Sequence, residues 1–334
     1  MNRTARVFSI VVPVYFNEDN LPETIPCLLA LGQRLPGYQL ELVFVDDGSG
    51  DHSLEILLDF QKHHPNAIQV IKLTRNFGAV AALQAGLVHT HGDCVGILAA
   101  DLQDPPELFL DMMKYWETGT KAIFAVRQDR EEGVFQKAYA SIYYRLVRRF
   151  ALRDYPEGGS DCILIDRQVV NDINRIREKN SNVAPLVFWL GYRPVLLPYV
   201  RRARKKGRSR WTLGKKVKLF IDTFVSFSYF PIRLFSIIGV LLSLGAFAYA
   251  CAAVYGWLRY GEAVEGWLSI ILILVVTSGI QMTMLGILGE YLWRTLEETR
   301  KRPPFVVDAI FPTTAFDPKH PTTNPVGVHD SREG

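Results

Sequence analysis

Two long apolar stretches in the C-terminal part of the sequence constrain this chain more than any other feature. No Asp, Glu, Lys or Arg occurs over 234–258, which is 25 residues, or over 266–289, which is 24 residues. A helix that crosses the hydrocarbon core of a bilayer needs about 20 apolar residues, because each residue adds about 1.5 Å. A buried core helix could be equally apolar, but two such runs joined only by 259–266 disfavour that alternative. We therefore expect a two-helix transmembrane region over 231–294.

Basic residues flank both apolar stretches. Seven of the ten residues in 201–210 are Lys or Arg, and Arg294 and 300–302 follow the second stretch. Cytoplasmic flanks of membrane spans carry an excess of Lys and Arg, so this distribution predicts a cell (inner) membrane protein with both termini in the cytoplasm. Nucleic-acid binding is the alternative for a basic run, but no nucleic-acid-binding motif accompanies it. We expect membrane lipids as partners and no nucleic acid.

The segment 214–230 has the pattern of an amphipathic helix. Its apolar residues fall on one helical stripe, and its lysines lie elsewhere. The stripe consists of Val217, Phe220, Ile221, Phe224 and Val225. Because this segment leads directly into the first apolar stretch, we predict an interfacial helix on the membrane, with packing against the soluble part as the alternative.

The N-terminal residues, the cysteines and the C-terminal residues each add one further expectation. The first residues reach Pro13 and a polar turn after a short apolar run, which does not fit a signal peptide. The four cysteines are scattered without metal or redox spacing, which fits a reducing compartment. We assign 295–334 to a cytoplasmic tail and expect it to be largely disordered after 303, because it is Pro-rich and polar.

Strands and helices alternate over the first 130 residues. Apolar runs of strand length occupy 8–14, 40–45, 68–73, 94–100 and 121–126, and helical patterns occupy 21–35, 53–63, 79–89 and 105–118. Apolar runs of this kind suit parallel strands covered on both faces. The pattern predicts an α/β domain over 1–213 with a doubly wound, mostly parallel sheet, whose ligands bind beyond the carboxyl ends of the strands.

Two of these strand ends carry paired acids. Asp46 and Asp47 precede Gly48, and Ser49 or Asp51 could cap the following helix. A second acid exceeds what a cap requires and could accept a hydrogen bond from a ribose or a base. No G-x-G-x-x-G follows the first strand, which disfavours a nicotinamide-type dinucleotide site.

The segment ADLQD, 100–104, predicts a cation site. Asp101 and Gln103 offer hard oxygen ligands of the kind that hold Mg²⁺ or Mn²⁺ together with substrate phosphates. Asp104 stands immediately before Pro105, so we expect it to cap a helix that begins there.

These motifs resemble a known family. VVPVY (11–15), VDDGS (45–49), RNFG (75–78), ADLQDPPE (100–107) and GILGEYLWR (286–294) resemble the polyprenyl-phosphate glycosyltransferases of glycosyltransferase family 2. That group includes the bactoprenol glucosyltransferases and the dolichyl-phosphate-mannose synthases, and the resemblance covers roughly 7–305. It implies a GT-A type sheet and a metal-dependent, inverting transfer of one sugar from a UDP-linked nucleotide-sugar donor to a polyprenyl phosphate acceptor such as undecaprenyl phosphate. The product would be a lipid-linked sugar for cell-envelope glycosylation.

The resemblance also implies roles for individual residues. The nucleotide pocket would contain Pro13, Tyr15, Glu18, Val45, Asp47 and Arg75. Asp101 and Gln103 would hold the metal, with Asp101, Asp161 and Arg127 as catalytic residues. The acceptor phosphate would contact Arg127, Arg204, Ser209 and Arg210.

The sequence departs from the family pattern at three places. Ala99 replaces the first acid of the family's D-A-D-L-Q. PVYFNE places Asn17 on the family's glutamate position and Glu18 one residue later, and Ile163 stands where the family has Arg.

Two rival functions follow from the same motifs: a catalytically impaired membrane scaffold, and a processive polysaccharide synthase. The second is disfavoured because Gly207 occupies the place of the Gln in a Q-x-x-R-W motif. Paired spans also make a homo-oligomer an open alternative.

Overall fold

The computed structural model describes residues 6–127, 160–176, 182–202, 230–260 and 266–313, with a few positions between 145 and 156. The chain forms two compact units. The first comprises Met1–Lys216 with Pro303–Gly334, and the second comprises Val217–Arg302. The interfacial helix expected over 214–230 lies outside the described residues except for Phe230, where the first long helix begins.

The first unit is built on one sheet, which among the described residues has eight strands in the order β7-β5-β6-β4-β1-β2-β3-β8. The strands are β1 (Arg6–Val14), β2 (Tyr38–Asp46), β3 (Ile68–Leu73), β4 (Cys94–Ile97), β5 (Ala122–Arg127), β6 (Ile163–Asp166), β7 (Val195–Tyr199) and β8 (Val307–Phe311). The central strands β4, β1, β2 and β3 are parallel to one another, and β5 is parallel to β7. Only β6 and β8 pair with their neighbours in the antiparallel sense. The expected mostly parallel sheet is confirmed.

Helices cover both faces of this sheet. They are α1 (Leu21–Gln33), α2 (Ser53–His63), α3 (Ala79–Val88), α4 (Leu108–Glu117), α6 (Arg167–Arg175) and α7 (Val183–Trp189). The first three agree with the expected ranges to within two residues at each end. The fourth was expected at 105–118 but begins at Leu108, because 105–107 form turns in which Leu108 N donates to Pro105 O.

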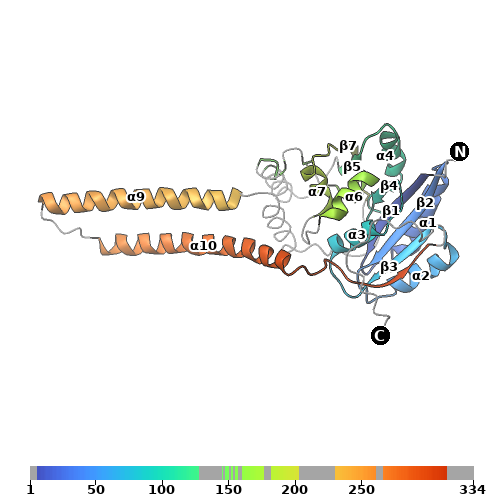
Figure 1. Ribbon diagram of the computed structural model, residues 1–334, viewed down its shortest axis with the longest axis horizontal. Helices are drawn as coiled ribbons and strands as arrows, with labels where there is room; N and C mark the ends of the chain where they lie inside the picture. Colours follow the sequence, from blue (N-terminus) through green and yellow to red (C-terminus); the bar gives the residue numbers. More distant parts are fainter. Residues whose placement is uncertain are drawn as a thin grey trace. The chain divides into compact units, whose positions relative to one another are not determined.

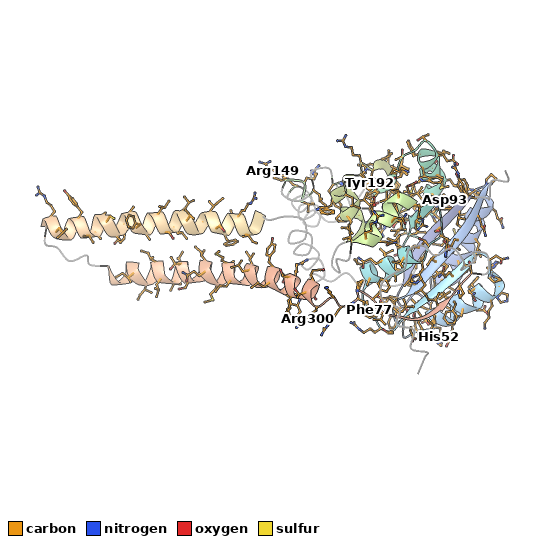
Figure 2. The ribbon with its side chains drawn as sticks, viewed as in Figure 1. His52, Phe77, Asp93, Arg149, Tyr192 and Arg300 are labelled. Carbon is orange, nitrogen blue, oxygen red and sulfur yellow. The ribbon has the colours of Figure 1, made fainter. Side chains whose placement is uncertain are left out.

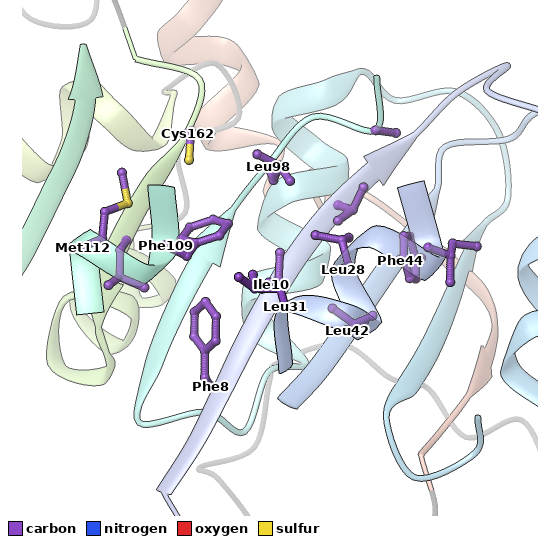
Figure 3. Packing of buried hydrophobic residues seen from close by; sticks show 14 of the residues in the cluster. Phe8, Ile10, Leu28, Leu31, Leu42, Phe44, Leu98, Phe109, Met112 and Cys162 are labelled. Atoms are coloured by element: carbon purple, nitrogen blue, oxygen red, sulfur yellow. The ribbon is translucent and has the colours of Figure 1, made fainter. Parts of the chain in front are cut away.

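Strand β1 is buried on both faces, as its continuous apolar sequence predicts. Phe8 and Ile10 point to one face and pack with Leu28 of α1 and Phe109 of α4 (Figure 3). On the other face α3 approaches so closely that a Cβ atom at Gly86 would lie 2.3 Å from Val11 Cγ1. Tight packing on both faces fixes the direction of the strand and therefore the position of its polar carboxyl end.

The expectation of a loose tail after 303 is wrong for its first part. Val307–Phe311 forms β8, which pairs antiparallel with β3. Thr74 N donates to Val306 O at 3.0 Å, and Lys72 Nζ lies 2.6 Å from Asp308 Oδ2. The unpaired edge of β3 explains the result, because an exposed strand edge offers N–H and C=O groups that another segment can satisfy.

The second unit contains two long helices that run side by side in opposite directions, α9 (Phe230–Tyr260) and α10 (Trp267–Thr299) (Figure 1). Their apolar parts, Ile232–Gly256 and Ile273–Thr299, have mean hydropathies of 2.2 and 1.5, and no residue in the most apolar window of either is buried. Phe247, for example, is 70% exposed. This exposure argues against soluble core helices, and the two helices are candidate membrane spans.

Candidate active site

The carboxyl ends of the central strands carry the residues that the sequence singled out. Asp47 follows β2 and is only 2% exposed. Its Oδ1 accepts a hydrogen bond of 2.7 Å from Phe77 N, and its Oδ2 accepts one of 2.9 Å from Gly78 N. Burial raises the pKa of Asp47, and these two amides oppose that effect only in part. The predicted nucleotide residue therefore also braces the RNFG loop after β3.

Glycine at position 48 allows the two loops to pack backbone against backbone. Gly48 has φ +67°, and a Cβ atom there would lie 2.6 Å from the carbonyl carbon of Arg75 and 2.7 Å from Asn76 N. Asp46, which is 1% exposed, accepts from Ser49 N at 3.3 Å and closes the turn on the other side. Both acids of VDDGS thus shape the turn. The sequence pattern suggested roles only as helix caps or ligands and did not predict these contacts between loops.

The segment PVYFNE, in which Glu18 stands one residue after the family's glutamate position, ends in a loop that is hydrogen-bonded to the start of α2. Phe16 adopts φ +53°, and its N–H donates to Ser49 Oγ at 3.1 Å. Glu18 accepts from His52 N at 2.9 Å, while its own N–H donates to Asp51 Oδ2 at 3.3 Å. The expected cap at Ser49 is wrong, because α2 has His52 at its N-cap position and Ser49 bonds to Phe16 instead. The other candidate, Asp51, accepts from Ser53 N at the helix start.

Arg75 projects from the braced loop. It is exposed, and its guanidinium carbon lies 4.0 Å from the centre of the Phe77 ring, an arrangement that orients the charge. Figure 2 shows Phe77 on this loop and His52 at the start of α2. Of the other predicted nucleotide residues, Pro13 and Tyr15 are half-buried at the end of β1, and Val45 is fully buried near the end of β2.

The loop after β4 presents the two oxygen donors expected for a cation. Asp101 and Gln103 are both half-buried, and Gln103 N donates to Asp101 Oδ1 at 3.3 Å. Leu102 between them has φ +51°. Over the described residues no group of three or more His, Cys, Asp or Glu side chains could hold a metal ion by itself. One carboxylate and one amide oxygen suit a hard divalent cation that takes its remaining ligands from water and phosphate.

Asp104 does not cap α4, contrary to expectation. Its side chain is fully buried and accepts a hydrogen bond from the Tyr199 hydroxyl at the end of β7. Arg201 Nε lies 3.3 Å from Asp104 Oδ1, and among the described residues Asp104 Oδ2 has no hydrogen-bond partner. Burial raises the pKa of Asp104, and Arg201 and Tyr199 oppose that effect. A buried acid needs polar or charged partners. For Asp104 they come from the end of β7 and the residues after it, and not from the N-terminus of α4.

A cluster of charged groups connects this loop with β5, β6 and β7. We define the arginine cluster as Asp104, Arg127, Asp161, Tyr199 and Arg201. Arg127 and Asp161, each expected as a catalytic residue, form an ion pair. Arg201 Nη2 lies 3.5 Å from the same Asp161 Oδ2. Nearby, Arg202 N donates to Gln103 O at 2.9 Å. Burial lowers the pKa of Arg127, but Asp161 and Tyr199 outweigh it, so the pKa lies above its ordinary value.

Sequence reasoning missed Tyr199 and Arg201. The signal was present in YVRR (199–202), a tyrosine and two arginines directly after a short apolar strand. The basic run hid that signal, because its residues were read together as a membrane-facing patch. Arg204, Ser209 and Arg210, which the resemblance placed near the acceptor phosphate, lie outside the described residues.

A shallow hollow of about 360 Å³, lined in part by Asp93, occurs at the opposite end of the sheet. Asp93 is labelled in Figure 2. The acids of the hollow already have partners: Asp166 accepts from Trp116 Nε1 at 2.9 Å, and Asp93 accepts from Val7 N at 2.8 Å. Ligands of such sheets bind at the carboxyl ends of the strands. The candidate active site is therefore the carboxyl edge and not this hollow.

Comparison with known proteins finds a matching family model, similar chains and similar solved structures. Residues 9–173 match the family model described as glycosyl transferase family 2. The chain is 38% identical over 302 residues to the uncharacterized glycosyltransferase YkcC of Bacillus subtilis, covering 90% of this chain and 93% of that protein. It is 32% identical over 303 residues to the prophage bactoprenol glucosyl transferase homolog of Escherichia coli, covering 90% of this chain and 98% of that protein. Among solved structures, the mannosyltransferase PcManGT from Pyrobaculum calidifontis, in complex with GDP-Man and Mn²⁺, has a TM-score of 0.48 and 17% identity, covering 90% of this chain and 89% of that chain.

Proposed function

The chain belongs to glycosyl transferase family 2, and from this premise we propose that it transfers one sugar from a UDP-linked donor to a polyprenyl phosphate such as undecaprenyl phosphate. The reaction takes place at the cytoplasmic face of the cell membrane and supplies a lipid-linked sugar for cell-envelope glycosylation. Relatives named bactoprenol glucosyl transferase, 31% identical over 300 residues, make glucose the first sugar to test.

One observation carries the proposal. The loop with Asp101 and Gln103 is joined to the end of β7 by the bond from Arg202 N to Gln103 O at 2.9 Å and by the contacts of Asp104. Oxygen donors for a cation and the two guanidinium groups of the arginine cluster therefore share one edge of the sheet. A transferase that brings two phosphate-bearing substrates together needs both kinds of group.

The side chains divide the work as follows. Arg75 and Tyr15 bind the nucleotide on the loops that Asp47 and Glu18 hold. Asp101 and Gln103 would hold Mg²⁺ or Mn²⁺, which when bound neutralises negative charge that develops on the departing diphosphate. Arg127 binds the acceptor phosphate, with Arg204, Ser209 and Arg210 as further contacts.

The acceptor needs no strongly activated base. Phosphate monoesters have a second pKa near 6, so a polyprenyl phosphate is largely dianionic at neutral pH and is already a nucleophile. Its oxygen attacks the anomeric carbon from the side opposite to the diphosphate, the bond to the diphosphate breaks, and the configuration inverts. Asp161 orients an acceptor or sugar hydroxyl.

Two features support the membrane location. The helices α9 and α10 are long and apolar enough to span a bilayer. Basic residues flank both, which favours cytoplasmic termini and an outward-facing link over 259–266.

The test is transfer by the purified full chain in detergent micelles with radiolabelled UDP-glucose, undecaprenyl phosphate and MgCl₂. We expect a glucosylated lipid whose anomeric carbon has the β configuration by NMR, and no product after addition of EDTA. Asp101→Asn should lose at least 100-fold in turnover if the carboxylate holds the cation. Asp59→Asn, an exposed change on α2, is the matched control and should retain full turnover.

Other outcomes contradict parts of the proposal. Transfer from UDP-N-acetylglucosamine or GDP-mannose alone would replace the donor while retaining the reaction. No lipid product with any of these donors, combined with no binding of UDP, would favour a membrane scaffold. Retained configuration at the anomeric carbon would exclude direct displacement.

A further inference from the structure

One carboxylate oxygen of the arginine cluster serves two guanidinium groups. Asp161 Oδ2 pairs with Arg127 Nη2 and lies 3.5 Å from Arg201 Nη2. The three residues come from the end of β5, the segment before β6 and the segment after β7. Guanidinium groups bind carboxylates and phosphates with the same fork of N–H donors. Two arginines that converge on one anionic oxygen therefore also form a binding site for a phosphate oxygen.

Both arginines are held from behind. Arg127 Nε lies 3.4 Å from the Tyr199 hydroxyl, and Arg201 Nε lies 3.3 Å from Asp104 Oδ1. Tyr199 in turn donates to Asp104, whose side chain is fully buried. Arg127 is thus hydrogen-bonded on its Nε side, and Arg201 is held there by the charge of Asp104, since its Nε has no hydrogen-bond partner among the described residues. Both present an Nη2 group to Asp161. This arrangement keeps the pair in place whether or not Asp161 is the anion between them.

Asp161 is the least buried member of the three. Its side chain is 51% exposed, against 16% for Arg127 and 26% for Arg201. An exposed carboxylate can return to water at little cost, because its charge is solvated there. The more buried arginines gain more from keeping an anion between them. Replacing Asp161 by another anion between the two arginines therefore costs less free energy than leaving the arginines without an anion.

We infer that Asp161 occupies the place of the acceptor phosphate when no acceptor is bound, that the phosphate displaces it, and that Arg201 is a second arginine of the acceptor site. This inference rests on the proposed function, because it takes the acceptor to be a polyprenyl phosphate. A dianionic phosphate brings more charge to the two arginines than a single carboxylate. Only molecules in which Asp161 has left the two arginines can bind the acceptor phosphate there. The apparent affinity for the acceptor is therefore the intrinsic affinity multiplied by the fraction of such molecules.

The test measures binding and not turnover. Farnesyl phosphate, a short polyprenyl phosphate, is titrated into the detergent-solubilised full chain by isothermal calorimetry, and UDP is titrated separately. Asp161→Asn removes the internal anion and should bind farnesyl phosphate roughly tenfold more tightly. Arg201→Gln should bind it roughly tenfold more weakly. Both variants should bind UDP as the unmodified chain does, which also shows that they are folded.

Arg202→Gln is the matched control, because Arg202 is adjacent, pairs with Glu107 at 3.4 Å and lies outside the cluster. It should leave farnesyl phosphate binding unchanged. Should Asp161→Asn fail to bind UDP, Asp161→Ser removes the same charge and takes its place. Equal or weaker binding of farnesyl phosphate by the Asp161 variants would overturn the exchange, and unchanged binding by Arg201→Gln would remove Arg201 from the site.

The outcome is separable from that of the proposed function. Tighter binding of farnesyl phosphate by Asp161→Asn, combined with no sugar transfer by the unmodified chain from any donor, would leave the exchange standing and reject the transferase. Sugar transfer by the unmodified chain, combined with unaltered farnesyl phosphate affinity in both variants, would support the transferase and reject the exchange.

Discussion

The backbone amide of Phe77 donates a hydrogen bond of 2.7 Å to the buried carboxylate of Asp47. This contact, with the parallel one from Gly78, joins the loop after β2 to the loop after β3. An acid that a motif would assign to the nucleotide thus also fixes the loop that carries Arg75.

Asp47→Asn should weaken UDP binding about tenfold. The amide group of Asn would face a backbone N–H in place of one carboxylate oxygen, and a hydrogen bond to a charged group contributes about 1.5–3 kcal/mol. Calorimetric titration of UDP into the solubilised chain measures the effect, and Asp59→Asn serves as the exposed control. Unaltered UDP affinity would show that the loop does not depend on Asp47.

Gly48→Ala should destabilise the sheet unit by about 2–4 kcal/mol, because the added Cβ meets strain at positive φ and overlap with the 75–76 backbone. Gly37→Ala separates the two causes. Gly37 has φ +91° but nothing within 4 Å of its Cβ position, so it should lose only about 1 kcal/mol. Thermal unfolding of both variants measures the difference, and equal losses would rule out the backbone overlap.

Ala99→Asp should restore the acid that the family pattern has at this position. Ala99 is half-buried and stands two residues before Asp101, so a second carboxylate is added near the same loop. Cation affinity rises with the number of charged ligands, and the Mn²⁺ concentration for half-maximal binding should fall roughly tenfold. Electron paramagnetic resonance counts bound Mn²⁺ in the presence of UDP. Ala99→Asn, which adds no charge, should bind Mn²⁺ as the unmodified chain does.

Asp166→Asn should lower stability near pH 7 by about 1 kcal/mol. Burial raises the pKa of Asp166, but hydrogen bonds from Lys121, Trp116 and Gln168 N outweigh it, so the pKa lies below its ordinary value of 3.8. A lowered pKa stabilises the folded state above the unfolded value and loses that effect as the pH falls through the folded value. The melting temperatures of variant and unmodified chain should therefore converge as the pH falls below the ordinary value of 3.8. A gap that stays constant with pH would contradict the assignment.

Ending the chain after Arg302 should lower the melting temperature of the sheet unit by about 10 °C, because β3 loses several hydrogen bonds to β8 and about 1 kcal/mol corresponds to a few degrees. UDP binding should weaken as well, since Thr74 N bonds to Val306 O immediately before Arg75. A chain that ends after Thr313 keeps β8 and is the control. Equal melting temperatures of the two truncated chains would show that β8 adds no stability.

The sequence predicted the central strands and most helices because their apolar periodicity is local. By resemblance it also assigned both Arg127 and Asp161 to the catalytic site, but it did not predict the ion pair between them. It failed at Asp104, whose position before two prolines suggested a cap but whose partners lie about 95 residues away on and after β7. It failed again at β8, because a five-residue strand after two long apolar helices has no periodicity that distinguishes it from a polar tail. In both cases the decisive contact joins residues far apart in the chain.

The position of β8 after both apolar helices has a consequence for biosynthesis. The ribosome makes β3 first, then α9 and α10, and only afterwards Val307–Phe311. If the two helices insert into a bilayer as proposed, the edge of β3 lacks during that insertion the segment that later covers it, and an unpaired strand edge can pair with other chains. The eight-stranded sheet is thus completed last, after both long apolar helices have been synthesised.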